Sequence, residues 1–161
     1  MASWLEPVSE VVAAEAIAFN EKLEALLARV PSIHTIPAAL VRAARKEGKG
    51  LFGVPVYVPE AKDISIQGRS GEIKLRVIRP PGEAKGVYLH IHGGGWTLGG
   101  ADQQDVMLQE LAKATGLVAA SIEYRLAPEH PFPAAEEDCE DVANWLIAGG
   151  ATVLAAPTRF A

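Results

Sequence analysis

Residues 86–96 read GVYLHIHGGGW, a mostly apolar run followed directly by three consecutive glycines. The apolar part, Gly86 to Ile91, has the length and composition of a β-strand that is buried on both faces. The next helical pattern begins only near Asp102. A strand, a glycine-rich loop and a helix in this order predict an α/β fold whose loop backbone comes close to a ligand.

The three glycines allow a particular kind of chemistry. Backbone N–H groups can turn toward a ligand here because no Cβ stands in the way. Two N–H groups directed at one point stabilise the negative charge that develops in a tetrahedral intermediate. A loop of this type lies beside the nucleophile of lipases and esterases. The loop is therefore a candidate oxyanion hole.

Two alternatives compete for the same loop. Gly93, Gly95 and Gly99 also resemble a dinucleotide-binding pattern, with Glu123 at the end of the next strand in the place of a ribose-binding acid. That pattern requires the helix to begin at the glycines, whereas the expected helix begins several residues later. The other alternative is a glycine-rich linker that binds nothing.

The segments on either side continue an alternation of strands and helices. Polar and apolar residues alternate from Lys62 to Val77 around a turn at 68–71, which predicts a β-hairpin with one solvent-facing side. Asp102 is expected to cap a helix that has Asp105 as its third residue and ends at Gly116. The other expected elements are helices at 7–30 and 37–46, a strand at 117–123, a helix at 134–147 ended by Gly149 and Gly150, and a strand beginning at Arg159.

A second motif decides between the alternatives. Residues 123–138 read EYRLAPEHPFPAAEED, and Trp145 follows seven residues later. Together with the HGGGW loop, this block resembles the α/β-hydrolase esterases of the hormone-sensitive-lipase-like family, from about Ile64 to Ala161. The resemblance implies an incomplete α/β-hydrolase fold: helices, an antiparallel hairpin, then parallel strands and helices. Residues 1–50 are similar in kind to the family's helical cap, and residues 51–161 to the N-terminal part of its core.

The resemblance also assigns roles within the loop. The N–H groups of Gly94 and Gly95 are expected to form the oxyanion hole, with Gly93 allowing the turn. His92 is expected to anchor the loop and not to act as the general base. Trp96 is expected either to line the acyl side of the pocket or to pack as an ordinary loop aromatic.

Charged residues of the second motif are expected to brace it. Arg125, Glu129 and Asp138 are interpreted as internal ion-pair partners and not as catalytic groups. Glu123 departs mildly from the family, in which many members have Asp at this position. Cys139 lies on the apolar face of the expected acidic helix, so we interpret it as a buried small side chain and not as a nucleophile.

The sequence contains no nucleophile elbow. An esterase of this kind needs the serine of a G-x-S-x-G motif, followed by an acid and a histidine. The nearest match, Ser70, belongs to the expected hairpin turn. In the family, the strand expected at Arg159 leads into the nucleophile elbow. We therefore expect the catalytic serine, acid and histidine to lie beyond residue 161. Residues 1–161 alone are expected to be inactive. A complementary C-terminal hydrolase half is the expected partner, and without it the strand at 86–91 would have an open edge.

Composition narrows the function classes. The 161 residues carry 15 basic and 20 acidic side chains, a net charge of -5, which argues against a nucleic-acid partner. A single cysteine excludes an internal disulfide and fits the cytoplasm, and no segment is apolar enough for a membrane span. We expect hydrolysis of short to medium acyl esters without a cofactor or metal, with a homo-oligomer possible for the full-length protein. The alternative is a non-catalytic fragment or a small-molecule receptor on the same scaffold.

Overall fold

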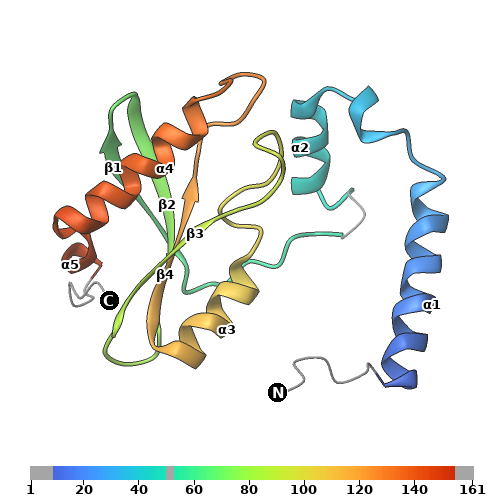
Figure 1. Ribbon diagram of the computed structural model, residues 1–161, viewed down its shortest axis with the longest axis horizontal. Coiled ribbons are helices and arrows are strands. Elements are labelled where there is room, and N and C mark those ends of the chain that lie inside the picture. Colours follow the sequence, from blue (N-terminus) through green and yellow to red (C-terminus); the bar gives the residue numbers. More distant parts are fainter. Residues whose placement is uncertain (1–8, 50–52, 155–161) are drawn as a thin grey trace, which may run out of the picture. The chain divides into compact units, whose positions relative to one another are not determined.

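The computed structural model describes residues 9–49 and 53–154 (Figure 1). The chain divides into two compact units, with the division between Val54 and Pro55. Each unit is described by itself below. No helix in the described ranges is both long enough and apolar enough to cross a bilayer.

The N-terminal unit is helical. Helix α1 (Glu10–Leu27) begins after Ser9, whose side chain accepts a hydrogen bond from the N–H of Val12 at 3.3 Å. This cap makes α1 shorter than the predicted range of 7–30. A short turn, η1 (Ile33–Thr35), leads to α2 (Ala38–Lys46), which follows a proline and has Arg45 and Lys46 in its last turn, where they complement the helix dipole.

The second unit is built on a four-stranded mixed sheet in the order β1-β2-β4-β3. Strands β1 and β2 form the predicted antiparallel hairpin, with Gly68 opposite Gly71, and β2 continues antiparallel to β4. Strand β3 lies parallel to β4, as expected for strands joined through a helix. The bounds of the strands are β1 (Lys62–Gly68), β2 (Gly71–Ile78), β3 (Gly86–Ile91) and β4 (Leu117–Glu123).

Helices cover both faces of this sheet (Figure 1). Helix α3 (Asp105–Thr115) packs Leu108 and Ala112 against Ala119 of β4. On the other face, α4 (Ala134–Trp145) packs Val142 against the alternate β4 residues, which include Val118 and Ile122. The chain continues as a π-helical turn, η2 (Leu146–Gly150), and a short α5 (Ala151–Val153). Strand β4 is therefore buried on both sides, and almost all of it is inaccessible to solvent.

Three predictions about these elements are wrong. Strand β3 is not buried on both faces, because it is the outermost strand of the described sheet, with Tyr88 and Ile91 exposed. Helix α3 begins at Asp105 and not after Asp102, because the backbone of Gln104, with φ of -114° and ψ of 15°, is not helical. Helix α4 ends at Trp145, before the non-helical Gly149. The strand expected at Arg159 lies outside the described residues.

A buried ion pair connects α3 to the sheet. Asp105 is fully buried and accepts two hydrogen bonds from the guanidinium of Arg76 on β2, at 2.7 and 2.6 Å. It also accepts the N–H of Val58 at 2.9 Å. Hydrogen bonding to Asp105 raises the pKa of Arg76 above its ordinary value, and Arg76 also bonds the exposed Asp63 at 3.0 Å. This ion pair holds the start of α3, and with it the end of the glycine loop, against the sheet.

Candidate functional site

The glycine-rich loop begins where β3 ends and reaches the sheet again at Gly100. Its backbone is left-handed at Gly94, Gly95 and Gly99, with φ of 135, 62 and 98°, and also at Trp96, with φ of 55°. A Cβ on Gly94 would overlap the Leu98 carbonyl group, whereas a Cβ on Gly93 would meet open space. The turn therefore requires glycine at Gly94 and not, as the sequence suggested, at Gly93.

The carbonyl groups of residues 92–96 are all engaged. The His92 carbonyl accepts the Tyr124 hydroxyl at 2.7 Å, and the Gly93 carbonyl lies 3.0 Å from Nδ1 of His92. The Gly94 carbonyl accepts the N–H of Leu98 at 3.0 Å. The remaining two carbonyls, of Gly95 and Trp96, accept the Thr97 hydroxyl at 3.0 Å and the Ala127 N–H at 2.8 Å.

The N–H groups of Gly94 and Gly95 have no acceptor among residues 9–49 and 53–154. A peptide unit is planar, so a held carbonyl also fixes the N–H of the next residue. The bond from His92 Nδ1 to the Gly93 carbonyl thus orients the Gly94 N–H, and the bond from Leu98 to the Gly94 carbonyl orients the Gly95 N–H. Exposed donors on a restrained backbone are suited to bind an oxygen that carries negative charge.

Comparison with known proteins supports the fold that carries this loop. A family model described as the alpha/beta hydrolase fold matches residues 88–161. The chain has part of the α/β-hydrolase fold. The match begins within β3 and includes both the glycine loop and the 123–138 motif.

Relatives of this chain are named as esterases. The carboxylic ester hydrolase LipN of Mycobacterium tuberculosis is 44% identical over 94 residues, which are 58% of this chain and 25% of LipN. Esterase LipI of the same organism is 37% identical over 120 residues, 70% of this chain and 37% of LipI. A solved esterase from the archaeon Pyrobaculum calidifontis matches with a TM-score of 0.70 and 29% identity, covering 94% of this chain and 47% of that one. The chain thus spans less than half the length of these relatives.

His92 is a buried residue of the loop, only 4% exposed. A carbonyl oxygen can only accept, so the bond to Gly93 requires a proton on Nδ1. In the neutral ring Nε2 is then an acceptor, and it has no partner among the described residues. The ring stacks on Tyr124 with 4.2 Å between centroids and 13° between planes.

Tyr124 is the site residue that sequence reasoning missed. It is 5% exposed and follows β4 directly, where the chain turns into the 123–138 motif. The sequence does contain a signal, since parallel neighbouring strands end at the same edge of a sheet and so bring the residues after them together. Ile91 is opposite Ile122 in the register, which places His92 and Tyr124 near each other.

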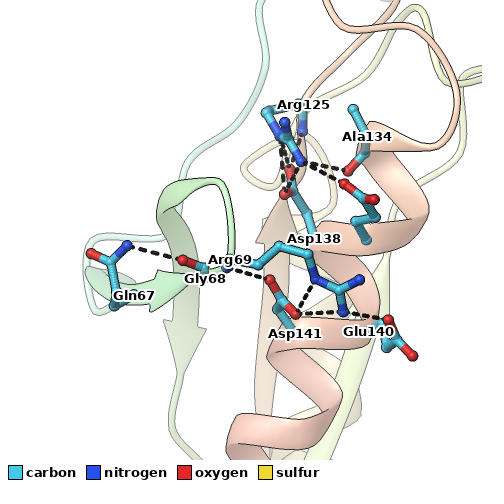
Figure 2. Close-up of polar contacts among 9 residues, drawn as sticks. Gln67, Gly68, Arg69, Arg125, Ala134, Asp138, Glu140 and Asp141 are labelled. Carbon is cyan, nitrogen blue, oxygen red and sulfur yellow. Dashed lines mark hydrogen bonds and ion pairs between the residues drawn. The ribbon is translucent and has the colours of Figure 1, made fainter.

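The segment after Tyr124 is fixed to α4 through Arg125 (Figure 2). Its guanidinium binds Asp138 with N–O distances of 2.9 to 3.0 Å and donates to the Ala134 carbonyl at 3.2 Å. The backbone N–H of Arg125 also donates to Asp138 at 2.9 Å. The predicted bracing role of Arg125 and Asp138 is confirmed. Hydrogen bonding to Asp138 raises the pKa of Arg125.

A second arginine fixes the other part of α4 (Figure 2). Arg69, in the β1–β2 turn, donates from Nε to Asp141 at 2.8 Å and also pairs with Glu140. Its backbone N–H donates to Asp141 at 2.6 Å. These contacts tie the hairpin to the helix that braces the loop. Ser70 lies in this turn, as predicted.

The alternatives raised for the loop do not fit the structure. The Glu123 carboxylate has a partner within the chain, because it accepts the Ala101 N–H at 2.6 Å. Helix α3 begins at Asp105, well after Gly99, so its N-terminus is not at the glycines. Trp96 is 60% exposed, which excludes the packed-aromatic interpretation within the described unit.

The other nucleophilic side chains are placed unfavourably. Ser121 is completely buried in β4 and bonded to His90 across the strands at 2.9 Å, where no substrate can reach it. Cys139 is half-buried, packs against the core, and has its pKa raised by burial to about 11, so it is a thiol at neutral pH. No cluster of three or more metal-ligating side chains occurs within the described residues.

His90 makes stability depend on pH. Burial, with a smaller contribution from His92, lowers the pKa of His90 below its ordinary 6.5. The unfolded chain therefore binds a proton near pH 6.5 that the folded chain binds only at lower pH, so stability is complete above that value and falls as the pH decreases. We expect the free energy of unfolding to decrease between about pH 7 and pH 5.5.

The measurement is urea unfolding at several pH values in this window. A His90→Gln variant should show a flatter dependence, because glutamine does not titrate while it can still hydrogen-bond to Ser121. An equally steep decrease in the variant would assign the effect to another group.

Proposed function

We propose that this chain supplies the oxyanion hole of a carboxylic ester hydrolase acting on short to medium acyl esters. The observation that carries the proposal is the pair of free N–H groups at Gly94 and Gly95, set between carbonyls that are all engaged. In the proposal these two groups bind the oxyanion and His92 anchors the loop. The exposed Trp96 contributes to the acyl side of the pocket.

The proposed reaction proceeds through an acyl-enzyme. A serine oxygen attacks the ester carbonyl carbon, and the carbonyl oxygen gains negative charge that the two N–H groups stabilise. The alcohol then leaves with a proton, and water releases the acid in a second addition. The serine, acid and histidine of this scheme come from outside the 161 residues, since no G-x-S-x-G motif occurs in them. This chemistry needs no metal or organic cofactor.

The same proposal includes a complementary C-terminal half as partner. Strand β3 is the outer strand of the described sheet, and Tyr88 and Ile91 are exposed on it. An outer strand of this kind presents unpaired backbone groups that a further strand can bind. The helical segment 1–50 would help to cover the substrate. A single cysteine fits a cytoplasmic setting, and the complete protein could form homo-oligomers.

The test is hydrolysis of p-nitrophenyl butyrate by the polypeptide that the complete gene encodes, compared with residues 1–161 alone. We expect turnover by the former and none by the latter, because oxyanion donors without a nucleophile cannot form an acyl-enzyme. A Trp96→Ala variant should raise KM if the indole lines the acyl pocket. Binding of esters without turnover by the complete polypeptide would favour a receptor on the same scaffold and contradict the proposal.

A further inference from the structure

We propose that Tyr124 is a positioning residue for the oxyanion loop, acting through His92 on the Gly94 N–H. The inference rests on the proposed function, because it concerns the same loop. Tyr124 touches neither glycine of the proposed oxyanion hole, yet it makes two separate contacts with His92: a hydrogen bond to its carbonyl and a stack on its ring.

The stack is what holds the His92 ring. Of the two ring nitrogens, Nδ1 lies against the Gly93 carbonyl, and the buried Nε2 has no partner in the described part of the chain. A ring held by one hydrogen bond can tilt about that bond. The nearly parallel Tyr124 ring, 4.2 Å away, opposes this tilt and so keeps Nδ1 on the Gly93 carbonyl.

The hydrogen bond fixes the backbone of the same residue. The Tyr124 hydroxyl is 2.7 Å from the His92 carbonyl, and burial raises the pKa of this hydroxyl, which keeps it a donor at neutral pH. Tyr124 therefore restrains His92 at both ring and main chain. The planar Gly93–Gly94 peptide carries this restraint to the Gly94 N–H.

The far side of the loop is held by the same segment of chain. Three residues after Tyr124, the Ala127 N–H donates to the Trp96 carbonyl at 2.8 Å. Between them, Arg125 is bound to Asp138 of α4. The 124–127 segment thus contacts the loop just before and just after its three glycines, and α4 keeps the distance between these two contacts constant. An oxyanion hole gains from such pre-organisation, because its donors need not reorient during the reaction.

The test uses the hydrolase encoded by the complete gene and a Tyr124→Phe variant, which keeps the stacked ring and removes the hydroxyl. We expect kcat per titrated active site to fall about tenfold with KM within about twofold of wild type, the pattern of a lost transition-state interaction. Tyr124→Leu, which removes both contacts, should lower kcat further. Tyr57→Phe is the matched control, since Tyr57 is exposed and its hydroxyl bonds to Asp102, outside the glycine loop.

A second readout separates positioning from stability. In 15N-glycine-labelled protein the Gly94 amide signal should shift or broaden in Tyr124→Phe and stay unchanged in Tyr57→Phe. The inference is overturned by a kcat per active site within about twofold of wild type, or by a KM increase at unchanged kcat. If the wild-type polypeptide hydrolyses no ester, the proposed function fails. The Gly94 signal still decides whether Tyr124 positions the loop.

Discussion

Replacing Asp105 by asparagine should lower the free energy of unfolding by about 3–5 kcal/mol, because it breaks a buried ion pair and leaves the cation behind. The carboxylate of Asp105 is fully buried and binds Arg76 through two hydrogen bonds and Val58 through a third. Asparagine has nearly the same shape, so the loss comes from charge and hydrogen bonding and not from a cavity. Urea unfolding of the variant and of wild type measures the difference.

Two further variants show whether burial is the cause. Asp63→Asn removes the other carboxylate that binds Arg76, and because Asp63 is exposed we expect a cost below about 1 kcal/mol. A double variant, Asp105→Leu with Arg76→Met, removes both buried charges and should recover much of the lost stability. If Asp105→Asn cost no more than Asp63→Asn, the buried pair would not be a main support of α3.

Asp105 also shows where sequence reasoning fails. The sequence pattern placed Asp105 in the first turn of a helix, and such a pattern depends only on residues that are close in sequence. The partner that determines its role is Arg76, 29 residues earlier on another strand. Local patterns do not contain pairings between distant segments, so the ion pair could not be predicted.

The strands were predicted accurately where the pattern itself is local. The structure matches the expected ranges for the hairpin of β1 and β2 and for the bounds of β3 and β4. Runs of alternating or continuous apolar residues that end at glycine or proline are typical of strands, which is why these ranges could be predicted. The prediction that β3 is buried on both faces was wrong, since the burial of a strand depends on which strands lie beside it. At the site, the HGGGW motif indicated the loop, but the contact between His92 and Tyr124 depends on strand order and register.

The largest expected effect within the loop is that of Gly94→Ala. The φ of Gly94 is 135°, a conformation that costs alanine about 1–3 kcal/mol. The new Cβ would also overlap the Leu98 carbonyl group. Leu98 cannot simply move away, because its N–H donates to the Gly94 carbonyl at 3.0 Å. We therefore expect the loop to change conformation and the free energy of unfolding to fall by about 2 kcal/mol or more.

This change should also abolish most of the ester hydrolysis that we propose for the polypeptide encoded by the complete gene. Movement of the Gly94 peptide misplaces both N–H donors of the proposed oxyanion hole, and the loss of one such donor typically lowers kcat by about 10²–10³. Gly93→Ala is the matched control for stability, since its Cβ would meet no atom within 4 Å and the φ of Gly93 is not left-handed. Urea unfolding and p-nitrophenyl butyrate hydrolysis measure the two effects. Equal stability of the two alanine variants, or undiminished turnover in Gly94→Ala, would show that the backbone at Gly94 does not shape the site.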